Sequence, residues 1–343
     1  MIKFFTLFLL VQIAIFGCQS NQDSQLKNYV DSKNQFSIFK YEINSIKDLF
    51  LERYGFKSPE QEIVEIKKLL ISELYEQDMD YVFNIIFPTP EFTVGNSPKL
   101  LVTSPRNKIE RGSELLISSS INLKDVEKIE NTIEEEENLS SIIIDIGGIA
   151  AYPAIVKESN NPRQLFLTFS HEWLHQYLIF HPLGRSYFSS VKMKEINETL
   201  ANIFSDKLLF SLCLKEFELK EEICSVEGRV KNEFDYSNFM KNLRLEVDNL
   251  LFERKILEAE KLMKDSTLIL NNNGFKIRKI NQAWFAFNGT YGDSPSSISN
   301  IDVELLKFID NQTTIKTAID ELKNINSLND YNNLIKDSAD IKK

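Results

Sequence analysis

The sequence predicts an α+β fold that is mainly helical, with a small sheet between helical N- and C-terminal parts. Apolar residues recur at helical spacing over residues 36–87, 236–271 and 301–335. By contrast, the runs 99–104 and 141–145 are rich in aliphatic and β-branched residues and are bounded by proline or glycine, as strands are. A length of 343 residues with 25 phenylalanines suits one large domain or two coupled domains.

The first seventeen residues have the pattern of a secretory leader. Lys3 provides a basic start, and the apolar run from Phe4 to Phe16 is too short for a convincing membrane span. Ile15-Phe16-Gly17-Cys18 resembles a bacterial lipobox, in which Cys18 would carry the lipid. An uncleaved anchor or a conventional signal peptide is the alternative. We therefore expect a tether over residues 18–35 and a protein held at a membrane surface in the cell envelope, outside the cytoplasm.

Charge and cysteine content narrow the choice of partners. The formal net charge is −10, which argues against nucleic acid and against electrostatic adhesion to anionic lipid. Besides Cys18 the chain has Cys213 and Cys224, which could form a disulfide in an exported protein. They lack C-x-x-C spacing, so a role in zinc binding is not expected.

The N-terminal helical region should cover residues 36–95. One helix is expected over 36–57. Ser58-Pro59-Glu60 is a typical helix start, with a cap and a proline in the first turn, and the helix that follows is predicted to reach about Phe87. Pro88 and Pro90 would end it.

The strands should belong to a central region over residues 96–215. The first is 99–104, and 115–120 is either a strand or a helix start. The acidic run 134–137 fits a solvated loop or helix end rather than a calcium site. The strand 141–145 leads into Gly147-Gly148-Ile149, where glycines beside a strand permit close backbone approach. An ordinary bulge is the alternative interpretation of these glycines.

His171-Glu172-Trp173-Leu174-His175 is the most specific motif in the chain. On a helix, His171 and His175 lie one turn apart on the same face and can reach one metal ion, with Glu172 beside it. This H-E-x-x-H pattern is typical of two zinc ligands and a carboxylate that activates water. Ser170 is the expected N-cap of this helix. The alternative is a pair of core histidines, which would bury Glu172 at a cost.

A second helix is expected over residues 194–214, after a break at 182–185. Its polar residues Glu195, Glu198, Asn202 and Asp206 recur at i+3/i+4 spacing. Glu198 is the preferred third zinc ligand, and Glu195 and His181 are alternatives. In a continuous helix His181 would lie about 15 Å along the axis from His171, too far to share an ion.

These two blocks, 171–175 and Asn197-Glu198-Thr199-Leu200-Ala201-Asn202, resemble the gluzincin metallopeptidases, whose pattern is H-E-x-x-H followed by N-E-x-x-x-D on a later helix. The resemblance covers about forty residues. It implies a zincin-like core over residues 96–215 with Zn²⁺ bound by His171, His175 and Glu198. Asn202 stands where the family usually has aspartate, and it would hydrogen-bond a ligand histidine less strongly.

The resemblance also implies a mechanism. Glu172 would act as general base toward the zinc-activated water. An edge strand including Gly147, Gly148 and Ile149 would hold the substrate backbone. No histidine lies downstream of the two blocks, so a tyrosine or arginine must stabilise the oxyanion. Tyr291 is the preferred hydrogen-bond donor to the oxyanion, and the alternatives are Arg185, Tyr187 and Arg278.

The C-terminal helical region should cover residues 216–343. We expect helices over 236–271, a buried aromatic segment over 277–293, and two amphipathic helices over 301–335. The function expected for the whole chain is a zinc-dependent peptidase acting on a peptide or protein. A non-catalytic zinc- or protein-binding lipoprotein is the alternative, and a hydrolase of non-peptide amides is a third possibility. If the enzyme were an aminopeptidase, Glu195 or Asp145 would be candidates to hold the free amine.

Overall fold

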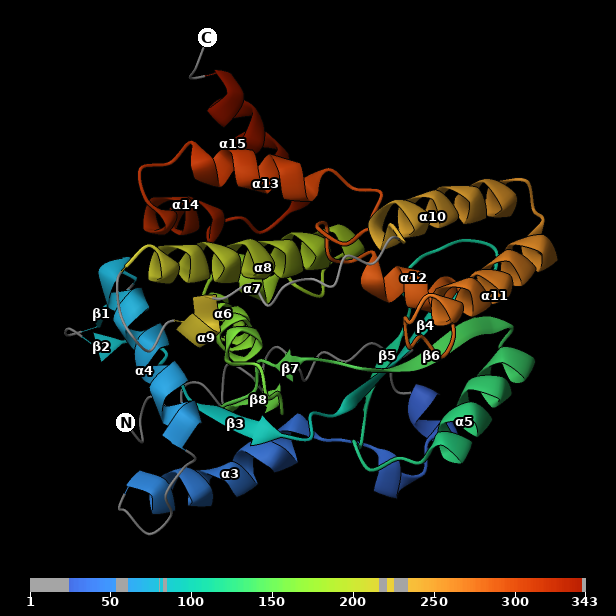
Figure 1. Cartoon of the computed structure of the whole chain (residues 1–343), viewed down its shortest axis with the longest axis horizontal. Coiled ribbons are helices and arrows are strands. Elements are labelled where there is room, and N and C mark those ends of the chain that lie inside the picture. Colours follow the sequence, from blue (N-terminus) through green and yellow to red (C-terminus); the bar gives the residue numbers. More distant parts are fainter. Residues whose placement is uncertain are drawn as a thin grey trace.

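The computed structural model describes the segments 25–53, 61–79, 81–82, 85–215, 221–224 and 234–340. Within these segments the chain is mainly helical and contains small sheets (Figure 1). The leader, Cys18 and the predicted helix start at 58–60 lie outside the described residues. None of the described helices combines the length and the apolar character needed to cross a membrane.

Two packed helices form the centre of the molecule, α6 (Pro162–Leu178) and α8 (Val191–Cys213). Helix α6 starts earlier than predicted. Asn161 is its N-cap, with a side chain that accepts from the backbone N–H of Gln164, and Pro162 follows. The expected cap at Ser170 is wrong, since its hydroxyl donates to the Phe166 carbonyl within the helix. The apolar run before the motif therefore forms the first turns of α6.

The break between these helices contains the short helix α7 (Pro182–Arg185). A Cβ atom on Gly184 would lie 2.2 Å from the Leu178 carbonyl oxygen, so only glycine permits this close return of the chain. Ser190 then caps α8 by accepting from the Met193 N–H. The chain thus reverses within a few residues, and α8 packs against α6.

One antiparallel sheet has the order β5-β4-β6, with β4 at Lys99–Pro105, β5 at Glu114–Ile117 and β6 at Leu139–Asp145. These confirm the predicted strands at 99–104 and 141–145, and of the two possibilities for 115–120 the strand is confirmed, over Glu114–Ile117. Alternate residues face helix α5 (Leu123–Glu136) on one side and helix α12 (Gln282–Asn288) on the other. The α5 side buries Leu101, Leu115, Ile117 and Ile143, and the α12 side Leu100, Val102 and Ile142.

A second sheet lies beside α6. Strand β3 (Phe92–Gly95) runs parallel to β8 (Ala154–Lys157), and β7 (Gly148–Ile149) pairs antiparallel with the other side of β8. The glycine-bearing segment is therefore an edge strand of a three-stranded sheet. This sheet places Gly148 next to the helix that carries the His-Glu-x-x-His motif.

The predicted helix from residue 58 to about Phe87 is wrong at its C-terminal end. Helix α4 spans Gln61–Glu76, and the chain then forms two short paired strands, β1 (Tyr81–Val82) and β2 (Ile85–Ile86). Asp78 has a positive φ of 51°, which terminates the helix. The aromatic and β-branched residues that follow favour strands.

The segment predicted as the end of the tether is packed on the protein. Leu26 and Val30 are buried in the cluster under α5, and Gln35 forms a β-bridge with Ile117. Helix α3 (Ile38–Arg53) follows, close to the predicted 36–57. The folded part of the chain thus begins before residue 35.

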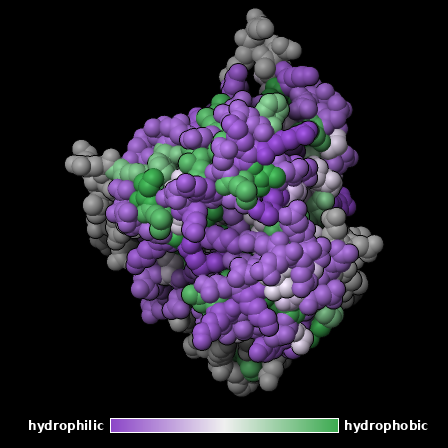
Figure 2. All heavy atoms as spheres, turned by 90° about the vertical axis from the view of Figure 1, so that its right-hand side faces the viewer, coloured by the Kyte–Doolittle hydropathy of each residue, from purple (hydrophilic) through white to green (hydrophobic). Residues whose placement is uncertain are grey.

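The C-terminal region contains α10 (Tyr236–Phe252) and α11 (Ile256–Asn272), which pack against each other beside α12 (Figure 1). Figure 2 shows the side of the molecule on which these helices lie. That surface is mostly hydrophilic, as expected for a net charge of −10, with hydrophobic side chains in a few small groups. The buried aromatic segment predicted over 277–293 contributes α12, whose Ala283 and Phe285 are fully buried.

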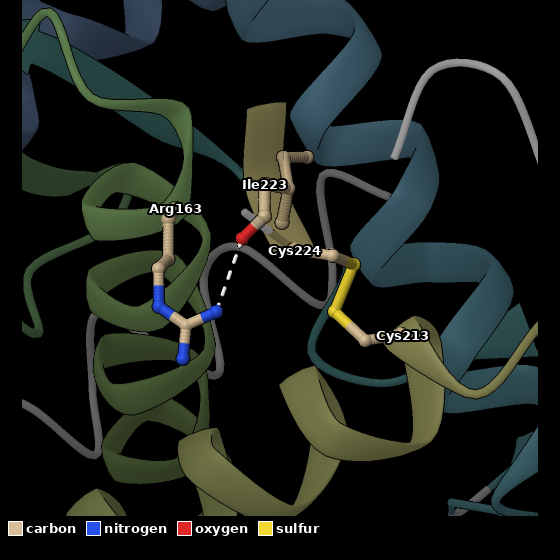
Figure 3. Close-up of a disulfide and its surroundings, with 4 residues drawn as sticks. All are labelled: Arg163, Cys213, Ile223 and Cys224. Carbon is tan, nitrogen blue, oxygen red and sulfur yellow. Dashed lines mark hydrogen bonds between the residues drawn. A yellow bond between two sulfur atoms is a disulfide. The ribbon is translucent and has the colours of Figure 1, made fainter. Parts of the chain in front are cut away.

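The tail forms three helices rather than the predicted two: α13 (Ile301–Asp310), α14 (Ile315–Leu322) and α15 (Leu328–Asp340). A capping box at Thr314 starts α14. These helices cover the side of α8 opposite α6 (Figure 1). At the end of α8, Cys213 forms a disulfide with Cys224 in α9 (Glu221–Cys224), beside a hydrogen bond from Arg163 to the Ile223 carbonyl (Figure 3).

Candidate metal centre

The structure brings together the two motif histidines and one glutamate. His171 and His175 lie one turn apart on α6 with their Nε2 atoms 3.1 Å from each other. Glu198, on α8, places Oε2 3.4 Å from Nε2 of His171 and 3.6 Å from Nε2 of His175. All three side chains are at most 15% exposed. This is the arrangement expected when α8 packs its polar face against the motif helix.

The spacing of these atoms suits a tetrahedral metal ion. Two ligand atoms about 2.1 Å from zinc at the tetrahedral angle lie about 3.4 Å apart. The three separations of 3.1, 3.4 and 3.6 Å cluster around that value. Two imidazoles and one carboxylate are a donor set that zinc accepts with a position left open. His171, His175 and Glu198 could therefore hold one divalent cation.

The two alternative third ligands lie elsewhere. His181 is the N-cap of α7, and its ring lies 4.6 Å from the ring of Tyr177. Glu195 accepts from the Lys192 ammonium at 2.8 Å and is not part of the cluster. Glu195 also does not line the cleft, so it is not placed to hold the free amine of a substrate there.

Glu172 is buried next to the cluster. A Cβ atom on Gly148 would lie 2.4 Å from its Oε1 and 2.9 Å from its Cδ, so the edge strand touches this carboxylate only because residue 148 is glycine. Burial raises the pKa of Glu172 to about 7, with a further contribution from Glu198 and an opposing one from His171. A carboxyl group with such a pKa exchanges protons readily near neutral pH.

Glu198 has the opposite behaviour. Burial acts against its charge, but the neighbouring histidines, His175 first, hold its pKa well below the usual range. Its carboxylate therefore remains charged and available to a cation.

Two tyrosines contact Glu198. Tyr187 donates a hydrogen bond from its hydroxyl to Oε1, and Tyr291 lies close enough for a side-chain hydrogen bond with the same group. Burial and then the Glu198 charge raise the pKa of both phenols well above 10. Both hydroxyls therefore keep their protons and can act as donors beside the cluster.

The position of Tyr291 is fixed by its two neighbours. Thr199 on α8 accepts a hydrogen bond from the Gly292 N–H at 2.8 Å, and Thr290 receives one from Arg111 at 2.8 Å. The turn after α12 is thus tied to the helix that carries Glu198. The sequence pointed to this turn, but not to the residues that hold it.

The expected partner of Asn202 is wrong. Its amide donates to both carboxylate oxygens of Asp293, at 3.1 and 3.2 Å, and not to a ligand histidine. Asp293 follows Tyr291 closely in the same turn, so the amide links α8 to that turn. An aspartate at residue 202 would repel Asp293, which explains why an amide suits this position.

The remaining candidates lie outside the cluster. Arg185 is exposed on α7. Arg278 binds the buried Glu130 and the Ile143 carbonyl under the β5-β4-β6 sheet, so it does not reach the site. Asp145 is engaged by two lysines, Lys99 and Lys157. Arg185 and Arg278 therefore do not line the cleft around the cluster, and the charge of the Asp145 carboxylate is balanced by the two lysines.

The cluster lies in a large cleft of about 1360 Å³. The edge strand forms one wall, with Gly147, Gly148 and Ile149 close to His171 and Glu172. Helix α8 contributes Glu198, Asn202 and Asp206 to the lining, and the turn after α12 contributes Tyr291 and Asp293. An elongated molecule could thus lie along β7 and pass over the three potential ligands.

No family model, curated protein or solved structure matches this chain. The chain is therefore described from its own fold and site. The chain is a mainly helical α+β protein with a His-His-Glu cluster in an open cleft.

Proposed function

We propose that the protein is a zinc-dependent peptidase with a zincin-like core. The observation that carries this proposal is the convergence of His171, His175 and Glu198 beside the buried Glu172, in a cleft open to a large substrate. A purely structural zinc site would be closed by a fourth protein ligand and would have no use for Glu172. The resemblance of both sequence blocks to the gluzincins supports the same conclusion.

In this proposal His171, His175 and Glu198 would hold Zn²⁺, which would supply Lewis-acid activation of water and of the scissile carbonyl. Glu172 takes the proton of the attacking water and passes it to the leaving amine, a task that its pKa of about 7 suits. Tyr187 and Tyr291 are the donors that would stabilise the developing oxyanion, since both present protonated hydroxyls next to Glu198. Of the two hydroxyls, that of Tyr187 makes the better-defined hydrogen bond to Glu198.

Substrate binding is assigned to the edge strand. An extended peptide can add to the side of β7 that faces away from β8, where none of the described strands pairs, by backbone hydrogen bonds as edge strands allow. Gly147, Gly148 and Ile149 would then align the peptide over Glu172. The absence of a side chain at residue 148 lets the backbone of β7 approach the Glu172 carboxylate closely.

Export and anchoring through Cys18 remain part of the proposal. The disulfide between Cys213 and Cys224 supports an oxidising compartment outside the cytoplasm. Direct mass spectrometry of the protein from a membrane fraction would detect the lipid on Cys18. Recovery of a chain with an unmodified N-terminus would contradict the anchor.

The function is tested by zinc content and peptide cleavage measured on the same samples. The wild type should bind one zinc per chain and cleave members of a broad peptide library. Glu172→Gln should keep the zinc and lose cleavage, and Glu198→Gln should lose zinc. Glu195→Gln is a matched control on the same helix, because Glu195 is also buried but lies outside the cluster.

The alternative function is a non-catalytic zinc- or protein-binding lipoprotein on the same fold. It is favoured if the wild type and Glu172→Gln both bind zinc and neither cleaves any peptide. A chain that binds no zinc at all would overturn the peptidase and the zinc-binding function.

A further inference from the structure

A buried ionic cluster lies in the wall of the cleft, apart from the potential zinc ligands. It consists of Arg111, Glu114 and Lys194, whose side chains are 5%, 17% and 11% exposed. Glu114 bridges the two cations: Arg111 donates to its Oε1, and Lys194 donates to its Oε2 at 3.0 Å. Cations are seldom buried to this degree unless they are paired or bind a ligand.

This cluster is next to the proposed reaction centre. Lys194 precedes Glu198 by one turn of α8, about 6 Å along the helix axis. Arg111 donates from Nη1 to Thr290 at 2.8 Å, directly before Tyr291 in the chain. All three members of the cluster line the same cleft as His171 and Glu172. A group bound here would lie one or two residues along a peptide from the bond over the zinc site.

The balance of charge in the cluster includes one of the potential zinc ligands. The charged groups that act on the Lys194 ammonium are Arg111, Glu114 and Glu198. If Glu198 serves as a ligand to a divalent cation, its charge is taken up there. Of these three groups, Glu114 alone then remains to balance two buried cations. An anionic group entering the cleft would restore the balance.

We propose that Arg111 and Lys194 form a subsite for a carboxylate of the substrate. The proposal rests on the proposed peptidase function and specifies the substrate class: peptides that carry a carboxylate one or two residues from the cleaved bond. A guanidinium and an ammonium together suit this group, because both donate charge-assisted hydrogen bonds. The carboxylate could be the C-terminus of the peptide or an acidic side chain.

The aromatic residues around the cluster shape the subsite. Arg111 lies over the ring of Phe287, 5.0 Å from its centroid, and Lys194 lies 5.3 Å from the centroids of both Tyr187 and Phe188. These rings restrict water around the cations, which strengthens their interaction with an anion. A large polar group without charge would gain little binding affinity from the two cations.

The test is a comparison of peptide pairs that differ only in charge. Binding of N-acetylated peptides with a free C-terminal carboxylate is measured against the same peptides as amides, using zinc-loaded Glu172→Gln protein to prevent turnover. A third set, amidated but carrying Asp or Glu in the last two residues, separates the two sources of the carboxylate. The same pairs serve as substrates for the wild type.

We expect at least one carboxylate set to bind about tenfold or more tightly than its uncharged partner, as charge-assisted hydrogen bonds predict. Lys194→Met should reduce this ratio about tenfold or more, and Lys194→Arg should largely preserve it. Lys192→Met is the matched control. It removes an exposed lysine of the same helix that pairs with Glu195, and its ratio should equal that of the parent protein.

Equal binding of charged and uncharged peptides by the parent protein would overturn the subsite. If the preference for charged peptides is unchanged in Lys194→Met and in Arg111→Gln, the subsite is also overturned and the preference is assigned to the metal. These binding ratios do not depend on turnover. A wild type that shows the ratio but cleaves nothing therefore contradicts the peptidase function and leaves the subsite supported.

Discussion

Replacing Gly148 by alanine tests how closely the edge strand controls Glu172. The backbone at Gly148 is outside the left-handed region, so alanine is conformationally acceptable there. The new Cβ would nevertheless lie 2.4 Å from Oε1 of Glu172, against about 3.4 Å for an ordinary contact. The carboxylate must therefore move by about 1 Å, or the strand must shift by the same amount.

This displacement should affect catalysis far more than folding. A misplacement of about 1 Å in a catalytic group can lower the rate about 100-fold. The affected atoms are at the end of a side chain, so the loss in unfolding free energy should stay near the lower end of the ~1–3 kcal/mol typical of overpacking. Zinc affinity should be preserved, because Glu172 is not among the proposed ligands.

The assay compares kcat, zinc content and urea unfolding for Gly148→Ala and Gly95→Ala. Gly95, on β3 of the same sheet, is the matched control, since a Cβ there has nothing within 4 Å. We expect kcat to fall about 100-fold for Gly148→Ala and to change little for Gly95→Ala. Equal rates for the two variants would refute the idea that the strand positions the carboxylate.

Three further predictions concern other parts of the molecule. Burial raises the pKa of Glu42 to about 7, so the folded chain binds this proton more tightly than the unfolded one and loses stability as pH rises from 4.5 to 7. Glu42→Gln should remove this pH dependence, worth at most about 3 kcal/mol, in urea unfolding at pH 5 and pH 8. Reduction of the disulfide, whose cysteines are 11 residues apart, should lower the unfolding free energy by about 3 kcal/mol, read from the urea midpoint under reducing conditions. Tyr187→Phe should lower kcat about 100-fold with unchanged zinc content, measured by steady-state kinetics and metal analysis.

The local parts of the fold were predictable because they depend on short-range patterns. The spacing of His171 and His175 places them on one face of any helix, and the glycine and proline in the break allow the reversal that brings Glu198 back. The strands at 99–104 and 141–145 were predicted from their β-branched and aliphatic residues. By contrast, residues 81–86 were assigned to a helix, because an apolar run after a helix has no periodicity that marks a hairpin.

The surroundings of the site could not be predicted, because they depend on contacts between distant segments. Asp293 and Asn202 are 91 residues apart, and Arg111 and Thr290 are 179 residues apart. No spacing rule connects such pairs, and a single buried arginine in a sequence gives no signal of its burial. The correct choice of Glu198 as neighbour of the histidines required only the order of two helices, whereas the roles of Arg111 and Lys194 required the whole fold.

The long-range contacts also explain why the turn after α12 matters for the site. Thr199 and Asn202 on α8 bind Gly292 and Asp293, so the helix that supplies Glu198 holds the two residues that directly follow Tyr291. The same segment receives Arg111 through Thr290. Thr290 therefore connects the proposed carboxylate subsite to the proposed oxyanion donor, because its hydroxyl accepts a hydrogen bond from Arg111 and Tyr291 follows it directly in the chain.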